Sequence, residues 1–159
     1  MLLNKLLFGG LFVFLFHSSN AQGVTAMTAY DSASQYREMA DTLWNTEKPG
    51  REKLVTALDI LRKGLIYLNE PGVRDLAQGN MYLKYRRYNI LYDIAHIYSL
   101  LRDKDSTIQT LAAMYDVGGY YYDFMEKDTA FDFVRNEDRY KELINVMRRG
   151  EALWKGSAL

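Results

Sequence analysis

His96 is the side chain in this sequence best suited to proton transfer, and it is the one histidine after residue 21. Asp93 and Ser99 each lie three residues from it, which places them beside it if the segment is helical. A catalytic relay also needs a serine presented at a strained turn, and no glycine-rich elbow accompanies Ser99. We therefore expect no catalytic residues and no enzymatic activity.

Two further spacings imitate ligand-binding motifs but lack the positions that bind. Residues 103–105 begin like a calcium loop, yet Ile108 replaces the loop glycine and Met114 replaces its bidentate glutamate. Basic and aromatic residues alternate from Lys84 to Tyr88, as in sites for single-stranded nucleic acid, but a helix would scatter them around its axis. We expect no metal, no cofactor and no nucleic-acid partner.

The charge balance points the same way. The chain holds 20 Lys plus Arg against 20 Asp plus Glu, and removal of residues 1–21 would take away Lys5 and no acid. Binding to phosphate backbones relies on a basic excess, which this chain lacks. The sequence also has no cysteine, so it can form neither a disulfide nor a thiol-linked lipid anchor.

The first residues have the pattern of an export signal. Lys5 supplies the positive end, Leu6 to Phe16 is a nearly unbroken apolar run, and residues 19–21 offer small side chains at a cleavage point. The apolar run is shorter than the about 20 residues that span a bilayer. We expect residues 1–21 to be a cleaved signal, and the mature protein to be soluble and periplasmic or secreted, starting near Gln22.

Apolar residues recur at intervals of three and four over several stretches, which predicts helices, and no stretch shows the sustained alternation of a strand. Glycine, proline and polar clusters separate these stretches. The expected helices run from a cap at Asp31 or Ser32 to before Pro49, from Arg51 to Asn69, from about Asn80 to Leu101, from about Asp105 to Val117, and from Asn136 to Arg149, with a short one over Asp128 to Val134.

This pattern also suggests how the chain is organised. We expect one helical domain over residues 31–149, after a flexible leader over residues 22–30 and before a frayed tail over residues 150–159. Residues 71–79 are expected to form a loop, because Pro71 and Gly72 interrupt the helical period.

The two predicted helix pairs resemble tetratricopeptide repeats. Each first helix of such a pair carries a large residue, a large-small doublet and then an aromatic residue on one face. The matching positions are Tyr36, Met39, Ala40 and Leu43 in the first pair and Leu91, Ile94, Ala95 and Tyr98 in the second.

The second helix of the first pair matches through Ala57, Leu61 and Gly64. A glycine inside a helix costs about 1 kcal/mol relative to alanine, so Gly64 predicts a close helix contact. After the second pair comes a segment, hereafter the closing segment, from Asp128 to Ile144. It is similar to the end-of-group segment that closes some bacterial arrays of these repeats, through Asp128, Phe131, Arg135, Asp138, Arg139, Tyr140, Leu143 and Ile144.

The resemblance implies an all-α fold, a tetratricopeptide-like α-solenoid of two helical hairpins plus a C-terminal capping helical segment. It also implies a concave groove, lined by the first helices, where a partner segment lies. Trp44 and Tyr92 would face that groove instead of the core, so their truncation should spare the fold. Carried onto this sequence, the groove residues are Arg37, Asp41, Trp44, Asn89, Tyr92 and His96.

A tyrosine-rich face on the third predicted helix leaves two alternatives open. Tyr82, Tyr85 and Tyr92 either face a partner or pack internally against residues 71–79 or the closing segment. We expect a non-enzymatic module that binds a protein or peptide in the extracytoplasmic space. The alternative is a structural subunit that docks through the tyrosine-rich face onto a second copy or an envelope complex.

Overall fold

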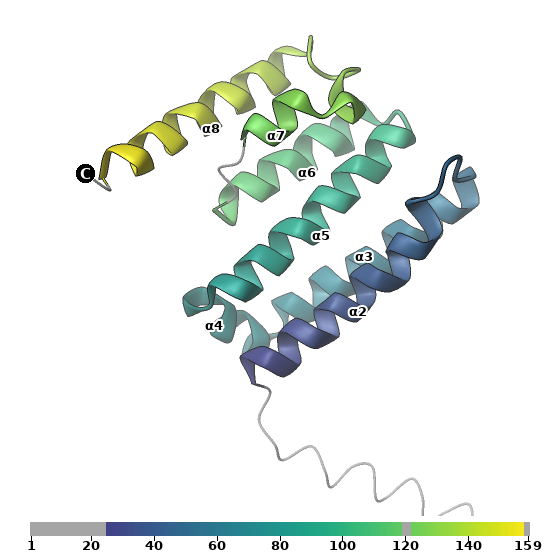
Figure 1. Ribbon diagram of the computed structural model, residues 1–159, viewed down its shortest axis with the longest axis vertical. Coiled ribbons are helices and arrows are strands. Elements are labelled where there is room, and N and C mark those ends of the chain that lie inside the picture. Colours follow the sequence, from purple (N-terminus) through teal and green to yellow (C-terminus); the bar gives the residue numbers. More distant parts are fainter. Residues whose placement is uncertain (1–24, 119–121, 158–159) are drawn as a thin grey trace, which may run out of the picture.

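The computed structural model describes residues 25–118 and 122–157, and every regular element in these ranges is a helix (Figure 1). The expected all-α class is confirmed. The predicted export signal lies outside the described residues. The elements are α2 (Ala26–Trp44), α3 (Arg51–Asn69), α4 (Pro71–Gly79), α5 (Met81–Leu100), α6 (Lys104–Asp116), α7 (Tyr122–Lys127), the 3-10 helix η1 (Thr129–Phe131) and α8 (Asp138–Ser157).

The helices pack in pairs. α2 lies along α3 and α5 lies along α6, and α5 joins the pairs by contacting both α2 and α3. Figure 1 shows α2 and α5 on the near face with α3 and α6 behind them. α7, η1 and α8 pack on the other side of the second pair, where η1 contacts α5 and α8 contacts α6.

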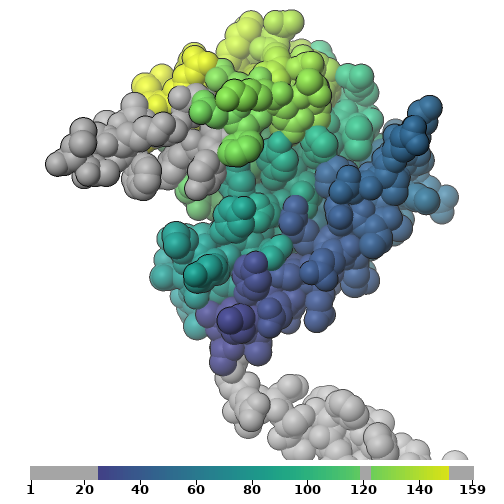
Figure 2. Space-filling view, in the orientation of Figure 1, coloured from purple at the N-terminus to yellow at the C-terminus, as the bar shows by residue number. Residues whose placement is uncertain are grey.

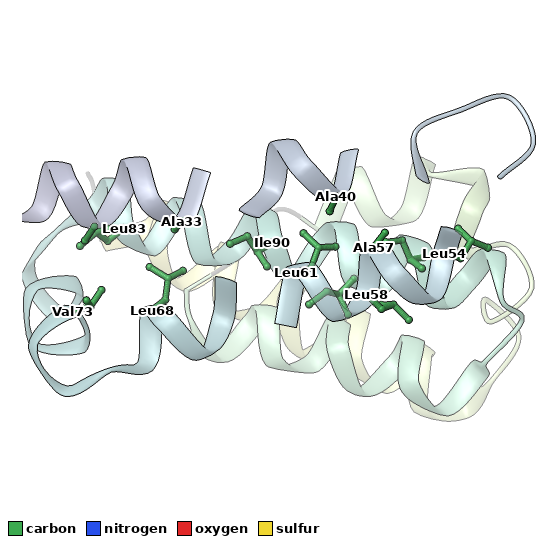
Figure 3. Packing of buried hydrophobic residues seen from close by; sticks show 13 residues of the cluster. Ala33, Ala40, Leu54, Ala57, Leu58, Leu61, Leu68, Val73, Leu83 and Ile90 are labelled. Atoms are coloured by element: carbon green, nitrogen blue, oxygen red, sulfur yellow. The ribbon is translucent and has the colours of Figure 1, made fainter. Parts of the chain in front are cut away.

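The first core lies between α2, α3, α4 and α5 (Figure 3). Its α2 face is built from alanines, which bring the backbones of α2 and α3 close together. A Cβ added at Gly64 would lie 3.0 Å from the Cβ of Tyr36, so the expected close contact at this glycine is present. The larger buried members are Leu54, Leu58, Leu61, Leu68, Val73, Leu83, Ile90, Ile94 and Ile97.

The second core lies between α5, α6 and the elements that follow. Phe131 and Val134 are fully buried, as is Met147 of α8. These side chains cover Leu91 and Leu111 of the second pair, which belong to the same cluster. The closing segment therefore supplies apolar cover for the open side of the α5–α6 pair, as a cap would.

Two expectations for α2 need correction. The helix begins at Ala26 instead of near Asp31, because Thr25 and Thr28 form a reciprocal capping box, so the end of the expected leader is helical. Met39, placed on the buried face from its spacing, is 57% exposed. The buried face instead follows Ala29, Ala33 and Ala40, whose small side chains made a weak apolar pattern.

Two further expectations are wrong. The range 71–79 is the helix α4, not a loop, with Pro71 at its first turn, where a missing N–H has no helical partner to lose. A frayed tail was expected from residue 150, but α8 continues past Arg149 and ends at Ser157. No helix within residues 25–118 and 122–157 is both long and apolar enough to cross a membrane.

Candidate functional site

A cleft of about 460 Å³ opens between α2, α5 and α7. Figure 2 shows the face on which α5 lies exposed between α2 and the segments that follow residue 121. Five of the six lining residues are contributed by α2 and α5, and α7 contributes the sixth. The cleft is lined by Arg37, Tyr85, Tyr88, Asn89, Tyr92 and Phe124.

Aromatic rings form a ladder along the α5 wall of the cleft. The ring centroids of Tyr85 and Tyr88 are 6.4 Å apart, and those of Tyr88 and Tyr92 are 6.5 Å apart. His96 continues the ladder 6.1 Å from Tyr92, and all three neighbouring pairs are within 16° of parallel. Sequence intervals of three and four place these side chains on one face of the helix.

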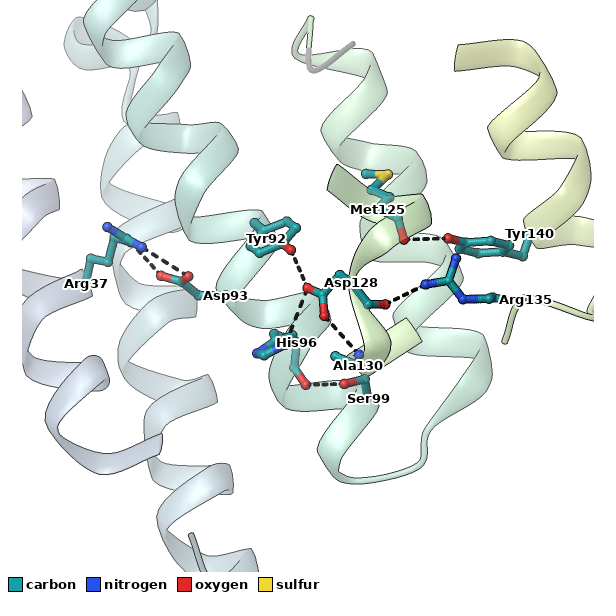
Figure 4. A network of polar contacts seen from close by, with 10 residues as sticks. All are labelled: Arg37, Tyr92, Asp93, His96, Ser99, Met125, Asp128, Ala130, Arg135 and Tyr140. Atoms are coloured by element: carbon teal, nitrogen blue, oxygen red, sulfur yellow. Dashed lines mark hydrogen bonds and ion pairs between the residues drawn. The ribbon is translucent and has the colours of Figure 1, made fainter. Parts of the chain in front are cut away.

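A buried ion pair fixes the α2 wall to α5 (Figure 4). The Nε and Nη2 of Arg37 donate to the two carboxylate oxygens of Asp93 over 2.6 and 3.2 Å. The Asp93 side chain is 4% exposed, against 36% for Arg37. Burial raises the pKa of Asp93, the bond from Arg37 opposes that rise, and the nearby Asp41 adds to it. The carboxylate therefore depends on Arg37 for its charge.

Asp128 ties α5 to the closing segment (Figure 4). Its Oδ2 accepts a hydrogen bond from the Tyr92 hydroxyl and lies 3.5 Å from Nε2 of His96. Its Oδ1 accepts the backbone N–H of Ala130 over 2.9 Å and so caps η1. Burial, and then the bond to Asp128, raise the pKa of Tyr92. Two rungs of the ladder are thereby held in one orientation.

Arg135 and Tyr140 hold the backbone that carries the α7 wall. Arg135 donates from Nη1 to the carbonyl oxygen of Glu126, and from Nη2 to that of Asp128 over 2.8 Å. The Tyr140 hydroxyl donates to the carbonyl oxygen of Met125 over 3.1 Å. Burial raises the pKa of Tyr140 to about 12. α7 is thus held to the residues that follow it.

Comparisons of the chain with protein-family models, with curated proteins and with solved structures found no match. The interpretation of the cleft therefore depends on its own residues and geometry.

Three of the residues expected to line a groove do line the cleft. Arg37 reaches it from α2, and Asn89 and Tyr92 reach it from α5. Tyr92 is also part of the fold, because its ring packs edge-on against Phe131 with centroids 5.9 Å apart. This packing opposes the expectation that Tyr92 can be truncated without loss of stability.

The other three expected residues lie beside the cleft. The Trp44 ring meets the His96 ring edge-on with centroids 5.2 Å apart, and Trp44 also packs against the first core. Its truncation would consequently disturb the fold, contrary to expectation. Asp41 is half-buried near the pair of Arg37 and Asp93. These side chains support the cleft instead of lining it.

The tyrosines of the tyrosine-rich face differ in whether they are exposed or packed internally. Tyr82 and Tyr85 are 69% and 54% exposed, so neither is packed internally. Tyr92, by contrast, contacts the closing segment through Asp128. Tyr85 therefore presents its ring at the cleft, whereas Tyr82 lies outside the lining on the same helix.

Sequence reasoning missed Tyr85, Tyr88 and Phe124 as groove residues, although it placed Tyr85 on the tyrosine-rich face. Tyr88 could have been found, because it lies three residues after Tyr85 and four before Tyr92 on the same helix face. Phe124 could not, because α7 reaches the cleft only through the tertiary packing of the segment that contains it.

The side chains that could have formed a proton relay are otherwise engaged. The Ser99 hydroxyl donates to the backbone carbonyl oxygen of His96 over 2.6 Å, not to the imidazole. Asp93 accepts from Arg37. Within the described residues, Ser99, His96 and Asp93 are therefore not linked into a proton relay.

Proposed function

We propose that the protein is an exported, non-enzymatic interaction module whose cleft binds a segment of another protein. The observation that carries this proposal is the pair of exposed aromatic side chains that line the cleft from two different helices, α5 and α7. Tyr85 is 54% exposed and Phe124 is 66% exposed. Aromatic side chains are enriched at the centres of protein interfaces, where they bury large areas at low conformational cost.

The scaffold supports this proposal. α2 and α5 are the first helices of their pairs, and together they supply every lining residue except Phe124. In the tetratricopeptide repeats that the sequence resembles, first helices line the groove that holds a partner. We therefore propose that the two pairs form a tetratricopeptide-like stack closed by the elements after residue 121.

Rigidity of the walls also favours binding. Asp128 holds Tyr92, and Asp93 holds Arg37, so both side chains have fixed orientations before any partner arrives. A site that is ordered in advance loses less conformational entropy when it binds. The cleft can therefore bind a segment without first rearranging.

Partner capture tests this function. Mature protein immobilised and exposed to envelope extract is expected to retain a stoichiometric partner, identified by mass spectrometry. Tyr85→Ala and Phe124→Ala should each abolish or strongly reduce that capture with helicity unchanged, because both side chains are exposed at the cleft. Tyr82→Ala is the matched control, an exposed tyrosine on the same helix outside the lining. Capture unaffected by either cleft variant would overturn the proposal.

Export is expected to remove the first 21 residues. Cleavage before Gln22 would leave every described helix whole, because α2 begins at Ala26 with its cap at Thr25. N-terminal sequencing of the protein purified from its native host should begin near Gln22. An intact Met1, or recovery from the cytoplasm, would contradict this expectation.

A structural role is the second candidate, and the exposed start of α5 favours it. Met81, Tyr82 and Tyr85 are 75%, 69% and 54% exposed within five residues. In this case Tyr82→Glu should convert a dimer to a monomer in light scattering while the helicity stays unchanged. A monomeric wild-type protein would remove self-association from consideration.

A further inference from the structure

The hydrogen-bonding character of the cleft identifies the kind of segment that fits it. Resting on the function proposed above, we propose that the occupant is a proline-rich segment of a partner protein in the polyproline II conformation.

The cleft offers more donors than acceptors. Arg37 uses Nε and Nη2 for Asp93, and among the described residues Nη1 has no acceptor, although the side chain is 36% exposed. The Asn89 amide likewise has no hydrogen-bond partner within residues 25–118 and 122–157. Tyr85 adds a hydroxyl at the exposed end. An occupant must therefore bring carbonyl oxygens.

Strong acceptors are lacking at the same place. None of the six lining residues is acidic. Two neighbouring carboxylates are engaged, since Asp93 accepts twice from Arg37 and Asp128 accepts from Tyr92 and Ala130. Asp41 lies near Arg37 but outside the lining. A strand-like or basic segment would bury N–H groups with few acceptors to receive them, which is costly. Proline has no backbone N–H, so a proline-rich segment avoids this cost.

The ladder suits the shape of such a segment. Polyproline II is extended, with about 3.1 Å per residue, three residues per turn and its carbonyl groups pointing outward. The rungs from Tyr85 through Tyr88 to Tyr92 advance in steps of 6.4 and 6.5 Å, so the wall spans roughly four residues of that helix. Aromatic-lined grooves bind proline-rich segments through ring faces in this way. Phe124 of α7 adds a further aromatic ring to the lining.

Net charge favours a neutral occupant. Arg37 is the one charged residue among the described residues that line the cleft, and Asp93 already neutralises it. The cleft therefore has little net attraction for an acidic or a basic segment. Proline-rich sequence matches a neutral, apolar site that supplies donors.

Titration of the mature protein with acetylated and amidated octaproline tests the inference. Saturable binding is expected, with a matched glycine-serine octapeptide at least about tenfold weaker because it is not preformed. Tyr85→Ala, Asn89→Ala and Phe124→Ala should each weaken octaproline binding about tenfold or more, on the scale of interface anchors. Tyr82→Ala should leave it unchanged, and circular dichroism confirms that each variant is folded.

The outcomes separate this inference from the function on which it rests. If the protein captures a partner through Tyr85 and Phe124 but does not bind octaproline, the polyproline inference is wrong and the interaction function stands. If octaproline binds equally well to the wild type and to all three cleft variants, the inference is also wrong. If neither octaproline nor a partner depends on the cleft, both proposals fail.

Discussion

A chain that ends at Lys127 is expected to lose cooperative melting. The truncation removes Phe131, Val134 and Met147, all fully buried, and uncovers the apolar faces of α5 and α6. Deleting a single core phenylalanine side chain costs about 3–5 kcal/mol, and whole domains are stable by only about 5–15 kcal/mol. Calorimetry of the truncated chain should therefore show no sharp transition near that of the full protein.

The point variant Phe131→Ala gives the same test within the full chain. We expect it to lower the free energy of unfolding by about 3–5 kcal/mol, because the ring is fully buried and meets the rings of Tyr92 and His96. Phe124→Ala is the matched control, since that ring is 66% exposed and should change stability by about 0.5 kcal/mol or less. Equal effects of the two substitutions would contradict the role of the closing segment as a cap.

Arg37→Met is expected to destabilise the protein by about 2–3 kcal/mol at neutral pH. It leaves Asp93 buried and charged with no partner, which in a fully buried pair costs about 3–5 kcal/mol. The smaller value allows for the 36% exposure of Arg37, which lets water screen the pair. Arg139→Met breaks an exposed pair with Asp105 and should cost about 0–1 kcal/mol, so urea unfolding of both variants isolates the effect of burial.

The effect of Arg37→Met should depend on pH in a definite direction. Burial already raises the pKa of Asp93 in the folded state, and loss of Arg37 removes the group that holds it down. An acid with a raised folded-state pKa contributes most to stability at low pH and loses that contribution as pH rises through its folded pKa. The deficit of the variant should therefore be largest near pH 7.5 and smaller near pH 4.5.

A second substitution identifies Asp93 as the cause. In Arg37→Met combined with Asp93→Asn, no buried carboxylate remains, so the deficit should shrink and lose its pH dependence. A deficit of Arg37→Met that is the same at both pH values would show that packing, and not the charge of Asp93, accounts for it.

Helix positions were largely predictable because they depend on local periodicity. The bounds of α3 agree with expectation, and Leu83, Ile90 and Ile97 of α5, which are spaced at helical intervals, are buried. A residue's position around a helix decides whether it faces the core, and that position follows from sequence spacing alone. The close helix contact at Gly64 was also predictable, because a glycine is costly inside a helix unless a neighbouring helix needs the space.

Boundaries were less predictable where local signals have two meanings. Pro71 disfavours helix in the residue before it but suits the first turn of a new helix, so the sequence signal is ambiguous. In the structure α4 forms, and its Val73 packs in the first core. The alanines of α2 carry little hydrophobic signal, so the helix start at Ala26 was missed. The first case was decided by contacts with other helices, and the second by the capping box of Thr25 and Thr28.

The sequence by itself determined the all-helical class and the principal apolar faces. It also indicated that the tyrosine-rich helix α5 carries part of a candidate site. Only the tertiary structure decided which side chains meet. Arg37 and Asp93 are 56 residues apart, Tyr92 and Asp128 are 36 apart, and Phe124 reaches the cleft from a different element. Periodicity states which face of a helix is buried, whereas the pairing of side chains across helices depends on how the helices are placed against one another.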